Sequence, residues 1–355
     1  MSTRQPTARA WVDINLDNVV ENARTVAEVA KGAALLPMVK ADAYGLGAVR
    51  VSRALETLDP WGFGVASVEE GIELRREGIE RPIVVFTPAR LGEIDVYAEN
   101  DLRAVVDDPG VAAEWHMPFH LEVDTGMGRC GVLWNDPDAL AGCARPSLEG
   151  VFTHFYGADR GPDTVGLQWS RFQTALGALG ERPALVHAAN SAAAWRLDER
   201  LDLVRPGIFL YGGMHAPDLP APLPAASLKA RVVSLRRLGE GDTVSYGGEW
   251  RAPCPTTVAT LGIGYADGIA RAVQGKAEVL LGGKRRPLVG KVTMDFVMVA
   301  LEDGDQVAVG DVATLIGSDG SGTIGIDEFA RWSGTISYEV LARLGARLPR
   351  RYQKE

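Results

Sequence analysis

The segment LLPMVKADAYGLGAVRVSRALETL, residues 35–58, contains the unit that decides the fold. An apolar run over 35–40 precedes an amphipathic stretch whose apolar residues recur at helical spacing: Val51, Ala54, Leu55 and Leu58. A short apolar strand followed by an amphipathic helix is the repeating unit of parallel sheets that helices cover. This stretch therefore predicts an α/β protein.

The same alternation continues to residue 206. Seven further apolar runs follow with amphipathic or polar stretches between them: 62–68, 82–86, 102–106, 119–124, 148–155, 184–190 and 203–206. Eight strands alternating with helices predict a (β/α)8 TIM-type barrel, with a doubly wound open sheet as the alternative. Only 12 residues separate Val106 from Phe119, so the helix between them must be short or missing.

The pattern changes at MHAPDLPAPLPA, residues 214–225, which is rich in proline and typical of a linker. Short β-type runs separated by Gly-rich turns follow it, among them TTVATLGIGYADG and GDVATLIG. We therefore expect a barrel over residues 12–228 and a mainly β C-terminal domain over 229–355.

Composition excludes several classes of protein. The 355 residues are 46% hydrophobic and 23% charged, as in soluble globular proteins, and the net charge is −9. An acidic chain is a poor non-specific binder of nucleic acid, and no run approaches the ~20 apolar residues of a membrane span. The start of the chain lacks the apolar core of a signal peptide, and three cysteines at unpatterned spacings suggest reduced thiols. We expect a cytoplasmic protein without nucleic-acid or membrane partners.

Unusual polar residues follow the predicted strands: Lys40, Arg129, His154, Asn190, Ser191 and Arg205. Barrel enzymes build their sites at the carboxyl ends of the strands, so these side chains are expected on one rim. A lysine after an apolar run is partly desolvated, which lowers its pKa and frees its amine as a nucleophile. Only seven lysines occur, none of them between Lys40 and Lys229. A strand-end lysine with its ammonium in solvent remains the alternative.

The turn Arg205-Pro206-Gly207-Ile208 resembles the phosphate-binding turns of barrels, with Ser191 and Tyr44 as further donors. An ordinary strand–turn sequence is the alternative. His154 and His187 lie on apolar strand patterns and are interpreted as core histidines. No spacing typical of a metal site or of a dinucleotide fingerprint occurs, so neither ligand is expected.

Taken together, the motifs resemble those of the alanine racemase family, which uses pyridoxal 5′-phosphate (PLP). The matching stretches follow the family's order over nearly the whole chain: VKADAYGLG, EVDTGMGRCGV, THF, HAANSAA, VRPGIFLYG, VSYG, GIGYADGIAR, GKVTMD and ISYEVLARLGARLPRRY. The resemblance implies a PLP-binding barrel followed by a β domain, with residues 1–11 as an N-terminal strand of the β domain.

The resemblance also implies roles for individual residues. Lys40 would form the Schiff base with PLP and act as one acid–base group. Tyr246 would be the opposite acid–base group, supplied with Met294 across the interface of a homodimer. Arg205 would bond the cofactor's pyridine nitrogen. As a permanent cation it should leave that nitrogen unprotonated and suppress transamination.

The remaining roles follow from the same resemblance. The phosphate would be bound by Tyr44, Ser191, Gly207, Ile208 and Tyr338. The substrate carboxylate would contact Arg129 and Met294. His154 would lie behind Tyr246 and Arg205, and Tyr265 would narrow the entrance with Asp295 nearby.

Three departures from the family pattern stand out. Glu122 occupies the position of a lysine that is often carbamylated in the family, and we hypothesise that it replaces the carbamate in orienting Arg129. Residues 107–118 are shorter than the usual connection by about a helix. The position of a leucine near the cofactor is taken by Val85 or Phe86.

The activity implied is interconversion of L- and D-alanine by a two-base mechanism, supplying D-alanine for peptidoglycan. A racemase of the same fold acting on serine or another small amino acid is the nearest alternative. A decarboxylase of similar fold would place an acid, not Arg205, on the pyridine nitrogen. A non-catalytic PLP-binding barrel would have neither the β domain nor a use for Tyr246.

Overall fold

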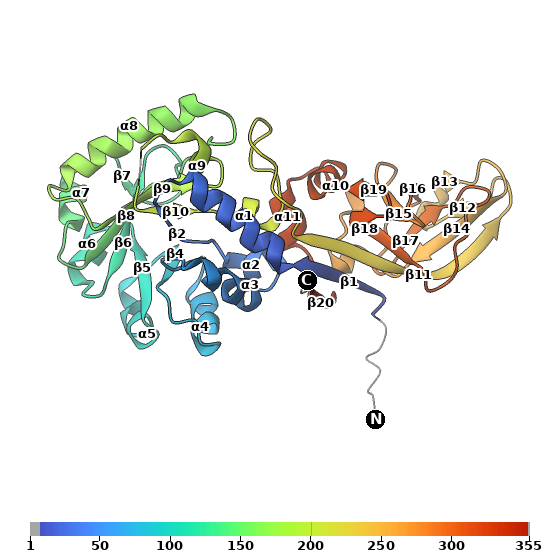
Figure 1. Cartoon of the computed structure of the whole chain (residues 1–355), viewed down its shortest axis with the longest axis horizontal. Coiled ribbons are helices and arrows are strands. Elements are labelled where there is room, and N and C mark those ends of the chain that lie inside the picture. Colours follow the sequence, from blue (N-terminus) through green and yellow to red (C-terminus); the bar gives the residue numbers. More distant parts are fainter. Residues whose placement is uncertain (1–7, 200, 354–355) are drawn as a thin grey trace. The chain divides into compact units, whose positions relative to one another are not determined.

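The chain folds into two compact units. The computed structural model describes residues 8–199 and 201–353. One unit runs from Val19 to Leu223, and the other combines the described residues up to Asn18 with those from Pro224 onward (Figure 1).

Parallel strands form the centre of the first unit. In spatial order they are β2 (Ala34–Leu35), β10 (Leu203–Arg205), β9 (Leu185–Asn190), β8 (Leu148–Phe152), β6 (Phe119–Asp124), β5 (Leu102–Val106), β4 (Ile83–Pro88) and β3 (Phe63–Val65), with β7 (Val132–Leu133) beside β6. A bridge between Met38 and Gly64 and a bond from Trp61 N–H to Leu35 O join the two edges of this sheet. The ring is therefore closed, and the predicted α/β barrel is confirmed.

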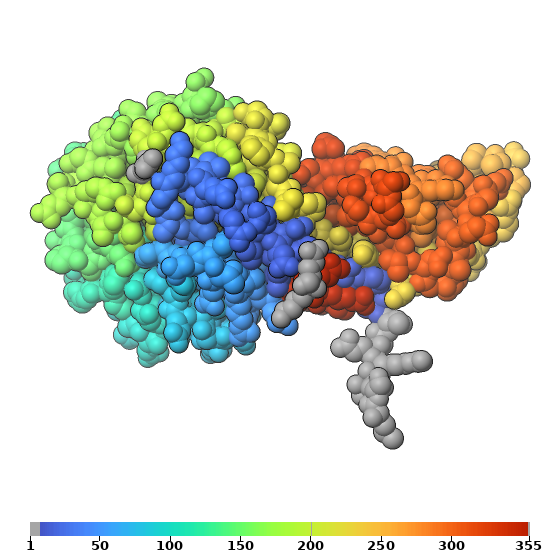
Figure 2. Space-filling view, in the orientation of Figure 1, coloured from blue at the N-terminus to red at the C-terminus, as the bar shows by residue number. Residues whose placement is uncertain are grey.

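Helices connect the strands on the outside: α1 (Leu16–Val29), α2 (Lys40–Gly45), α3 (Ala48–Leu55), α4 (Val68–Arg76), α5 (Ile94–Glu99), α6 (Pro109–Glu114), α7 (Pro137–Cys143), α8 (Pro162–Ala178) and α9 (Ala193–Arg196). As predicted, the helix between β5 and β6 is short, because α6 has six residues. The long helix α1 lies across the face seen in Figure 1, and its side chains reach the surface there (Figure 2).

The strands are apolar almost throughout because the barrel interior and the helices bury both of their faces. Inside the barrel, one cluster joins Leu36, which follows β2, to residues of β4, β5, β8 and β10: Val84, Val105, Phe152 and Leu203. This packed interior holds the strand ends rigidly, and the site described below is built on them.

The predicted strand over 35–40 is wrong in extent. Only β2 is regular, although Leu36 and Met38 still donate to Val204 O and Pro206 O of the neighbouring segment. Pro37 has no N–H to donate, so the ladder cannot continue regularly. Lys40 consequently begins α2 instead of ending a strand. The run 148–155 is likewise strand only to Phe152.

The second unit is a mainly β structure. Its sheet follows the order β19 (Gly322–Ile324), β18 (Val312–Asp319), β15 (Glu278–Leu281), β16 (Lys284–Val289), β17 (Val297–Ala300), β14 (Thr256–Leu261), β11 (Ala226–Leu238), β1 (Ala10–Asn15) and β20 (Arg350–Gln353). Because β18 also pairs with β11, six of these strands close a ring. A hairpin of β12 (Thr243–Val244) and β13 (Trp250–Arg251) and the helices α10 (Ile326–Ser333) and α11 (Ser337–Ala342) complete the unit.

The N-terminal segment joins this sheet through β1, which pairs antiparallel with β11 and parallel with β20. Of the segment 1–11 expected there, residues 1–7 lie outside the described residues. Within the described ranges, no helix is long and apolar enough to cross a membrane.

Candidate active site

Lys40 lies at the carboxyl edge of the barrel, directly after the segment that follows β2. The residue is half-buried, and burial lowers the pKa of this lysine, with Arg129 lowering it further and Glu70 opposing the shift. A lowered pKa leaves more of the amine neutral near pH 7, which is the form that acts as a nucleophile or a base.

A left-handed turn follows Lys40. Four consecutive residues, Ala41 to Tyr44, have φ between 52° and 56°, a conformation that costs L-residues of this kind free energy. The carboxylate of Glu70, from α4, accepts from Ala41 N–H and from Ala66 N–H at 2.7 Å each. Glu70 thereby fixes the start of the turn, and the turn directs Tyr44 back toward the strand ends.

Ser191 and Gly207 meet after strands β9 and β10. The Ser191 hydroxyl accepts from Gly207 N–H at 3.0 Å, and a Cβ on Gly207 would lie 2.5 Å from the Tyr44 hydroxyl oxygen. Glycine is thus required for this close approach. Ile208 continues the turn as the first residue of a 3₁₀ helix, η3 (Ile208–Tyr211). The structure therefore brings together Tyr44, Ser191, Gly207 and Ile208, four of the five residues that the sequence suggested for a phosphate.

Arg205 is buried at the end of β10. Nη1 donates to His187 Nδ1 at 2.8 Å, and Nη2 donates to Thr153 O at 2.8 Å and to Ala188 O at 3.2 Å. Burial lowers the pKa of Arg205 to about 9, with Glu122 opposing the shift, so the group is still a cation at neutral pH. Its position is fixed by three of its N–H groups.

Aromatic rings flank the Arg205 guanidinium. Its carbon lies 5.1 Å from the Phe152 ring centre and 5.9 Å from that of Phe86. Of the two residues proposed near the cofactor, Phe86 therefore lies beside Arg205.

His154 follows β8 and is also close to cations. Burial, and then Arg205, Arg129 and Lys40, lower its pKa to about 3. This imidazole is therefore neutral at physiological pH and can accept or donate a hydrogen bond.

Arg129 lies in the glycine-rich loop after β6. Asp124 at the strand end accepts from Gly126 N–H and Gly128 N–H, which holds the loop in a tight turn. Arg129 Nη2 lies 3.6 Å from Glu122 Oε1; the Glu122 residue is 4% exposed, whereas the Arg129 side chain is 53% exposed. Burial raises the pKa of Glu122, and Arg129 opposes the shift. A buried carboxylate thus contacts the arginine that the sequence suggested for substrate.

The second unit contains the other predicted site residues. Tyr246, in η4 (Tyr246–Gly248), is 73% exposed and Met294 is 51% exposed. Tyr265 begins η5 (Tyr265–Asp267) and donates its N–H to Thr293 O, beside Met294. Tyr246 and Thr293 line the same hollow of about 460 Å³, so this unit gathers Tyr246, Met294 and Tyr265 in one region.

Two further residues of the second unit are less closely tied to that hollow. Asp295 is ion-paired with Arg347 at 2.7 Å, and Arg347 also holds the fully buried Asp267. Tyr338 lies in α11 and is partly exposed.

Three residues near the site are not indicated by any motif in the sequence. They are Glu70, which fixes the turn after Lys40, and His120 and Glu149, which lie in line with the hydrogen bond between Arg205 and His187. His120 Nδ1 and His187 Nε2 are 2.8 Å apart, and His120 Nε2 is 3.4 Å from Glu149 Oε2. The signal in the sequence for His120 and Glu149 is a histidine or a carboxylate inside an apolar strand, whereas Glu70 is one of several charged residues of helix α4.

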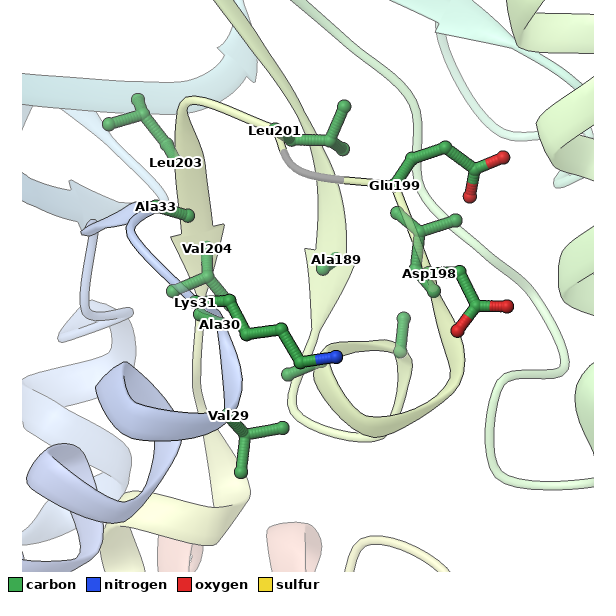
Figure 3. Close-up of a pocket in the computed structure, with 13 residues that line it drawn as sticks. Val29, Ala30, Lys31, Ala33, Ala189, Asp198, Glu199, Leu201, Leu203 and Val204 are labelled. Atoms are coloured by element: carbon green, nitrogen blue, oxygen red, sulfur yellow. The ribbon is translucent and has the colours of Figure 1, made fainter.

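A small cavity elsewhere in the barrel unit is no competing site. It lies between the end of α1 and strands β9 and β10, and the Lys31 side chain extends across it toward the segment of Asp198 and Glu199 (Figure 3). Its volume of about 30 Å³ suits a single water.

Comparison with known proteins places the two units in one family. Residues 14–215 match the model of the alanine racemase N-terminal domain, and residues 225–352 match that of the C-terminal domain. The alanine racemase of Carboxydothermus hydrogenoformans is 38% identical over 96% of this chain and 99% of its own, and that of Deinococcus radiodurans is 41% identical over 90% and 92%.

Solved structures agree with this match. The alanine racemase of Bacillus anthracis with bound L-Ala-P has a TM-score of 0.91 and 34% identity, covering 99% of this chain and 96% of that one. The Bartonella henselae alanine racemase with covalently bound pyridoxal phosphate has a TM-score of 0.89 and 28% identity, covering 98% and 100%. The chain therefore belongs to the alanine racemase family of enzymes.

Proposed function

We propose that this protein is a PLP-dependent alanine racemase that interconverts L- and D-alanine. The observation that supports this most is the meeting of a lysine of lowered pKa, a fixed buried arginine and a Ser–Gly turn at one edge of the barrel. The names of the relatives support the same activity and point to alanine as the substrate.

The residues present fit PLP. The Ser191 hydroxyl accepts from Gly207 N–H and keeps its own proton to donate, so that with the Tyr44 hydroxyl and the Ile208 N–H this turn would offer donors to a phosphate. Lys40 supplies the amine that would hold the aldehyde. Tyr338 is proposed as a further phosphate ligand.

Arg205 would contact the ring nitrogen. As a cation without an acceptor, it donates to that nitrogen and leaves it unprotonated. The neutral His154 would lie behind Arg205 and Tyr246 without adding a second positive charge.

When bound, PLP supplies the delocalisation that stabilises negative charge at the substrate Cα. The Lys40 amine would remove or return the Cα proton on one face. The Tyr246 hydroxyl would do so on the opposite face, so the substrate need not turn over. Arg129 and Met294 would hold the substrate carboxylate, and Tyr265 with Asp295 would limit access to the site.

We further propose a homodimer in which Tyr246 and Met294 reach the partner's site. Their large exposure supports this, since exposed tyrosine and methionine side chains are common at interfaces. The barrel, predicted over 12–228 and comprising the unit Val19–Leu223 in the structure, would hold the cofactor, and the domain predicted over 229–355, with the N-terminal strand, would supply these two residues. Production of D-alanine for peptidoglycan in the cytoplasm is the role proposed.

The test is a stereospecific assay of the PLP-loaded protein. L-alanine should give D-alanine, and D-alanine should give L-alanine, until equal amounts are present. A panel including serine separates an alanine racemase from one with another preferred substrate. Tight PLP binding without conversion of any amino acid would favour a non-catalytic PLP-binding protein and would contradict the proposal.

A further inference from the structure

A line of side chains crosses the barrel interior beneath Arg205. Arg205 Nη1 lies 2.8 Å from His187 Nδ1, and His187 Nε2 lies 2.8 Å from His120 Nδ1. His120 Nε2 then lies 3.4 Å from Glu149 Oε2. The four residues belong to β10, β9, β6 and β8, and they run from the carboxyl ends of the strands to their amino ends.

The Arg205 guanidinium at one end and the Glu149 carboxylate at the other determine which ring nitrogen of His187 and of His120 carries the proton. Arginine has no acceptor, so Arg205 must donate to His187 Nδ1, and His187 carries its proton on Nε2. That proton faces His120 Nδ1, so His120 in turn carries its proton on Nε2, where it faces the Glu149 carboxylate. An ionised carboxylate only accepts. Both histidines are therefore neutral Nε2–H tautomers, and each donates toward Glu149.

Burial agrees with this assignment. Both imidazoles are fully buried, and burial lowers the pKa of each. Glu149 is partly exposed; burial raises its pKa, but the contacts with His120 and Arg103 outweigh this and hold the pKa below the usual value of a glutamate. Arg103 Nε lies 3.6 Å from the same carboxylate oxygen. The line thus connects a buried cation to an anion near the opposite end of the barrel.

Neighbouring residues pack tightly against the rings of His120 and His187. A Cβ on Gly150 would lie 2.5 Å from His120 Nδ1, so glycine is required beside this ring. The His187 ring stacks on Phe152, with centres 4.9 Å apart, and Phe152 also lies under Arg205. A solvent-accessible groove of about 550 Å³ reaches Glu149 between Trp115 and Arg145.

We propose that Glu149, His120 and His187 act as positioning residues that set how strongly Arg205 donates to the cofactor's ring nitrogen. The Glu149 anion attracts the His120 Nε2–H proton across the 3.4 Å contact, and the two hydrogen bonds between His120 and His187 and between His187 and Arg205 pass this polarisation on, because hydrogen bonds in series polarise one another. His187 Nδ1 then accepts the Arg205 hydrogen bond more strongly. The guanidinium consequently donates less strongly to the cofactor's ring nitrogen. This inference rests on the proposed function, since it assumes that Arg205 meets the ring of PLP.

The first test needs no cofactor. The chain has five histidines, so ¹⁵N-histidine labelling of the apoprotein gives few signals, which His120→Gln and His187→Gln variants assign. We expect both residues to be neutral near pH 7 with unprotonated Nδ1. In Glu149→Gln the His120 signals should shift most and those of His187 less, while Glu114→Gln, an exposed control, should shift neither. A protonated Nδ1 on His187 or His120 in the unaltered protein would overturn the proposal.

The second test measures reaction specificity. The competing reaction would be a half-transamination, in which alanine and one water would leave as pyruvate and the amino group would remain on the cofactor in place of its aldehyde oxygen. Glu149→Gln weakens the last acceptor, so Arg205 should donate more strongly and draw more charge into the ring. We expect pyruvate formed per racemisation to rise roughly two- to five-fold.

The controls separate this inference from the proposed function. Glu114→Gln should leave the ratio unchanged, and PLP affinity should be equal in both variants. An unchanged ratio in Glu149→Gln, with racemisation intact in the unaltered protein, would refute the positioning role alone. Absence of racemisation in the unaltered protein would instead refute the proposed function, and the tautomer test would still stand.

Discussion

The position of its amine makes Lys40 reactive. Six other lysines are present, yet Lys40 combines burial with nearby Arg129 and Arg205, which lower its pKa. In the proposed enzyme this amine captures the cofactor and then carries a proton. The burial of Lys40 could be predicted from the sequence, because the residue comes at the end of an apolar run. The nearby cations Arg129 and Arg205 could not, because they come from distant strands.

Replacing Lys40 should remove the covalent attachment of PLP. After borohydride reduction, Lys40→Ala should retain no PLP on any peptide, while Lys276→Ala, at an exposed lysine, should retain it like the parent. Peptide mass mapping measures this directly. An adduct on another lysine in Lys40→Ala would contradict the assignment, and racemisation should fall by ~10²–10⁴-fold or more because an acid–base group is lost.

The contact between Glu122 and Arg129 carries a second prediction. An exposed ion pair contributes ~0–1 kcal/mol and breaking a buried one costs ~3–5 kcal/mol, and this pair has one buried and one half-exposed partner. Glu122→Gln should therefore raise the KM for alanine roughly ten-fold, with kcat and PLP binding changed much less.

Two controls accompany this measurement. Glu122→Asp keeps the charge and should restore part of the affinity, whereas Asp138→Asn, an exposed carboxylate in α7, should have no effect. Parent and Glu122→Gln should both be insensitive to bicarbonate, because a glutamate needs no carbamylation. Unchanged kinetics in Glu122→Gln would leave Glu122 without the proposed role.

Among single residues, those at strand ends were predictable and those inside the barrel were not. Lys40, Ser191 and Arg205 follow apolar runs, and parallel strands bring their carboxyl ends to one edge. His120 and His187 are 67 residues apart, and only the order of strands in the closed sheet makes them neighbours. The spacing of residues along the sequence does not predict which strands are neighbours, so the contact between the two histidines could not be predicted.

At the scale of elements, the left-handed turn after β2 is the least expected feature. Residues 41–44 are Ala-Asp-Ala-Tyr, and none of them is a glycine, the residue type that would predict a positive φ. Helical spacing was predicted only from residue 51 onward, and Pro37 shortened the predicted strand. The conformation is maintained by Glu70 and by tertiary contacts, such as the bond from the buried Tyr211 hydroxyl to Met38 O.

This turn should be intolerant of branched side chains. Ala41 is exposed, so Ala41→Val changes little packing, yet a β-branched residue at φ 54° should cost ~1–3 kcal/mol. The urea midpoint of the barrel unit should fall accordingly. Ala113→Val, at an exposed position of α6, is the control and should cost only ~0.5 kcal/mol. Equal midpoints for the two variants would argue against strain in the turn.

At the scale of the whole molecule, apolar runs alternating with amphipathic stretches predicted the barrel, and short β-type runs between Gly-rich turns predicted the β domain. No pattern along the chain indicates that the N-terminal strand joins the β domain; that expectation came from the resemblance to alanine racemases. The proposed reaction needs Lys40 from one unit and Tyr246 from the other. In the proposed homodimer these two residues come from different copies of the chain, so patterns within one sequence do not bring them together.

Tyr246→Phe should affect the two enantiomers unequally. If Lys40 and Tyr246 serve opposite faces, loss of the phenol should slow Cα proton exchange with deuterated solvent for one enantiomer by ~10²-fold or more, and less for the other. Mass spectrometry of recovered alanine measures both rates, with PLP absorbance confirming that cofactor remains bound. Equal slowing of both enantiomers would refute the two-base assignment.

Mixed dimers test whether Tyr246 acts across an interface. Lys40→Ala and Tyr246→Phe homodimers each lack a group in both sites. In a heterodimer of the two variants, the site that takes Lys40 from the Tyr246→Phe subunit receives Tyr246 from the Lys40→Ala subunit, and is intact. Random exchange at equal amounts makes half of the dimers mixed with one working site each, so about a quarter of the parent activity should return. If Lys40 and Tyr246 of the same chain formed the site, every site in the mixture would lack one group and mixing would restore nothing.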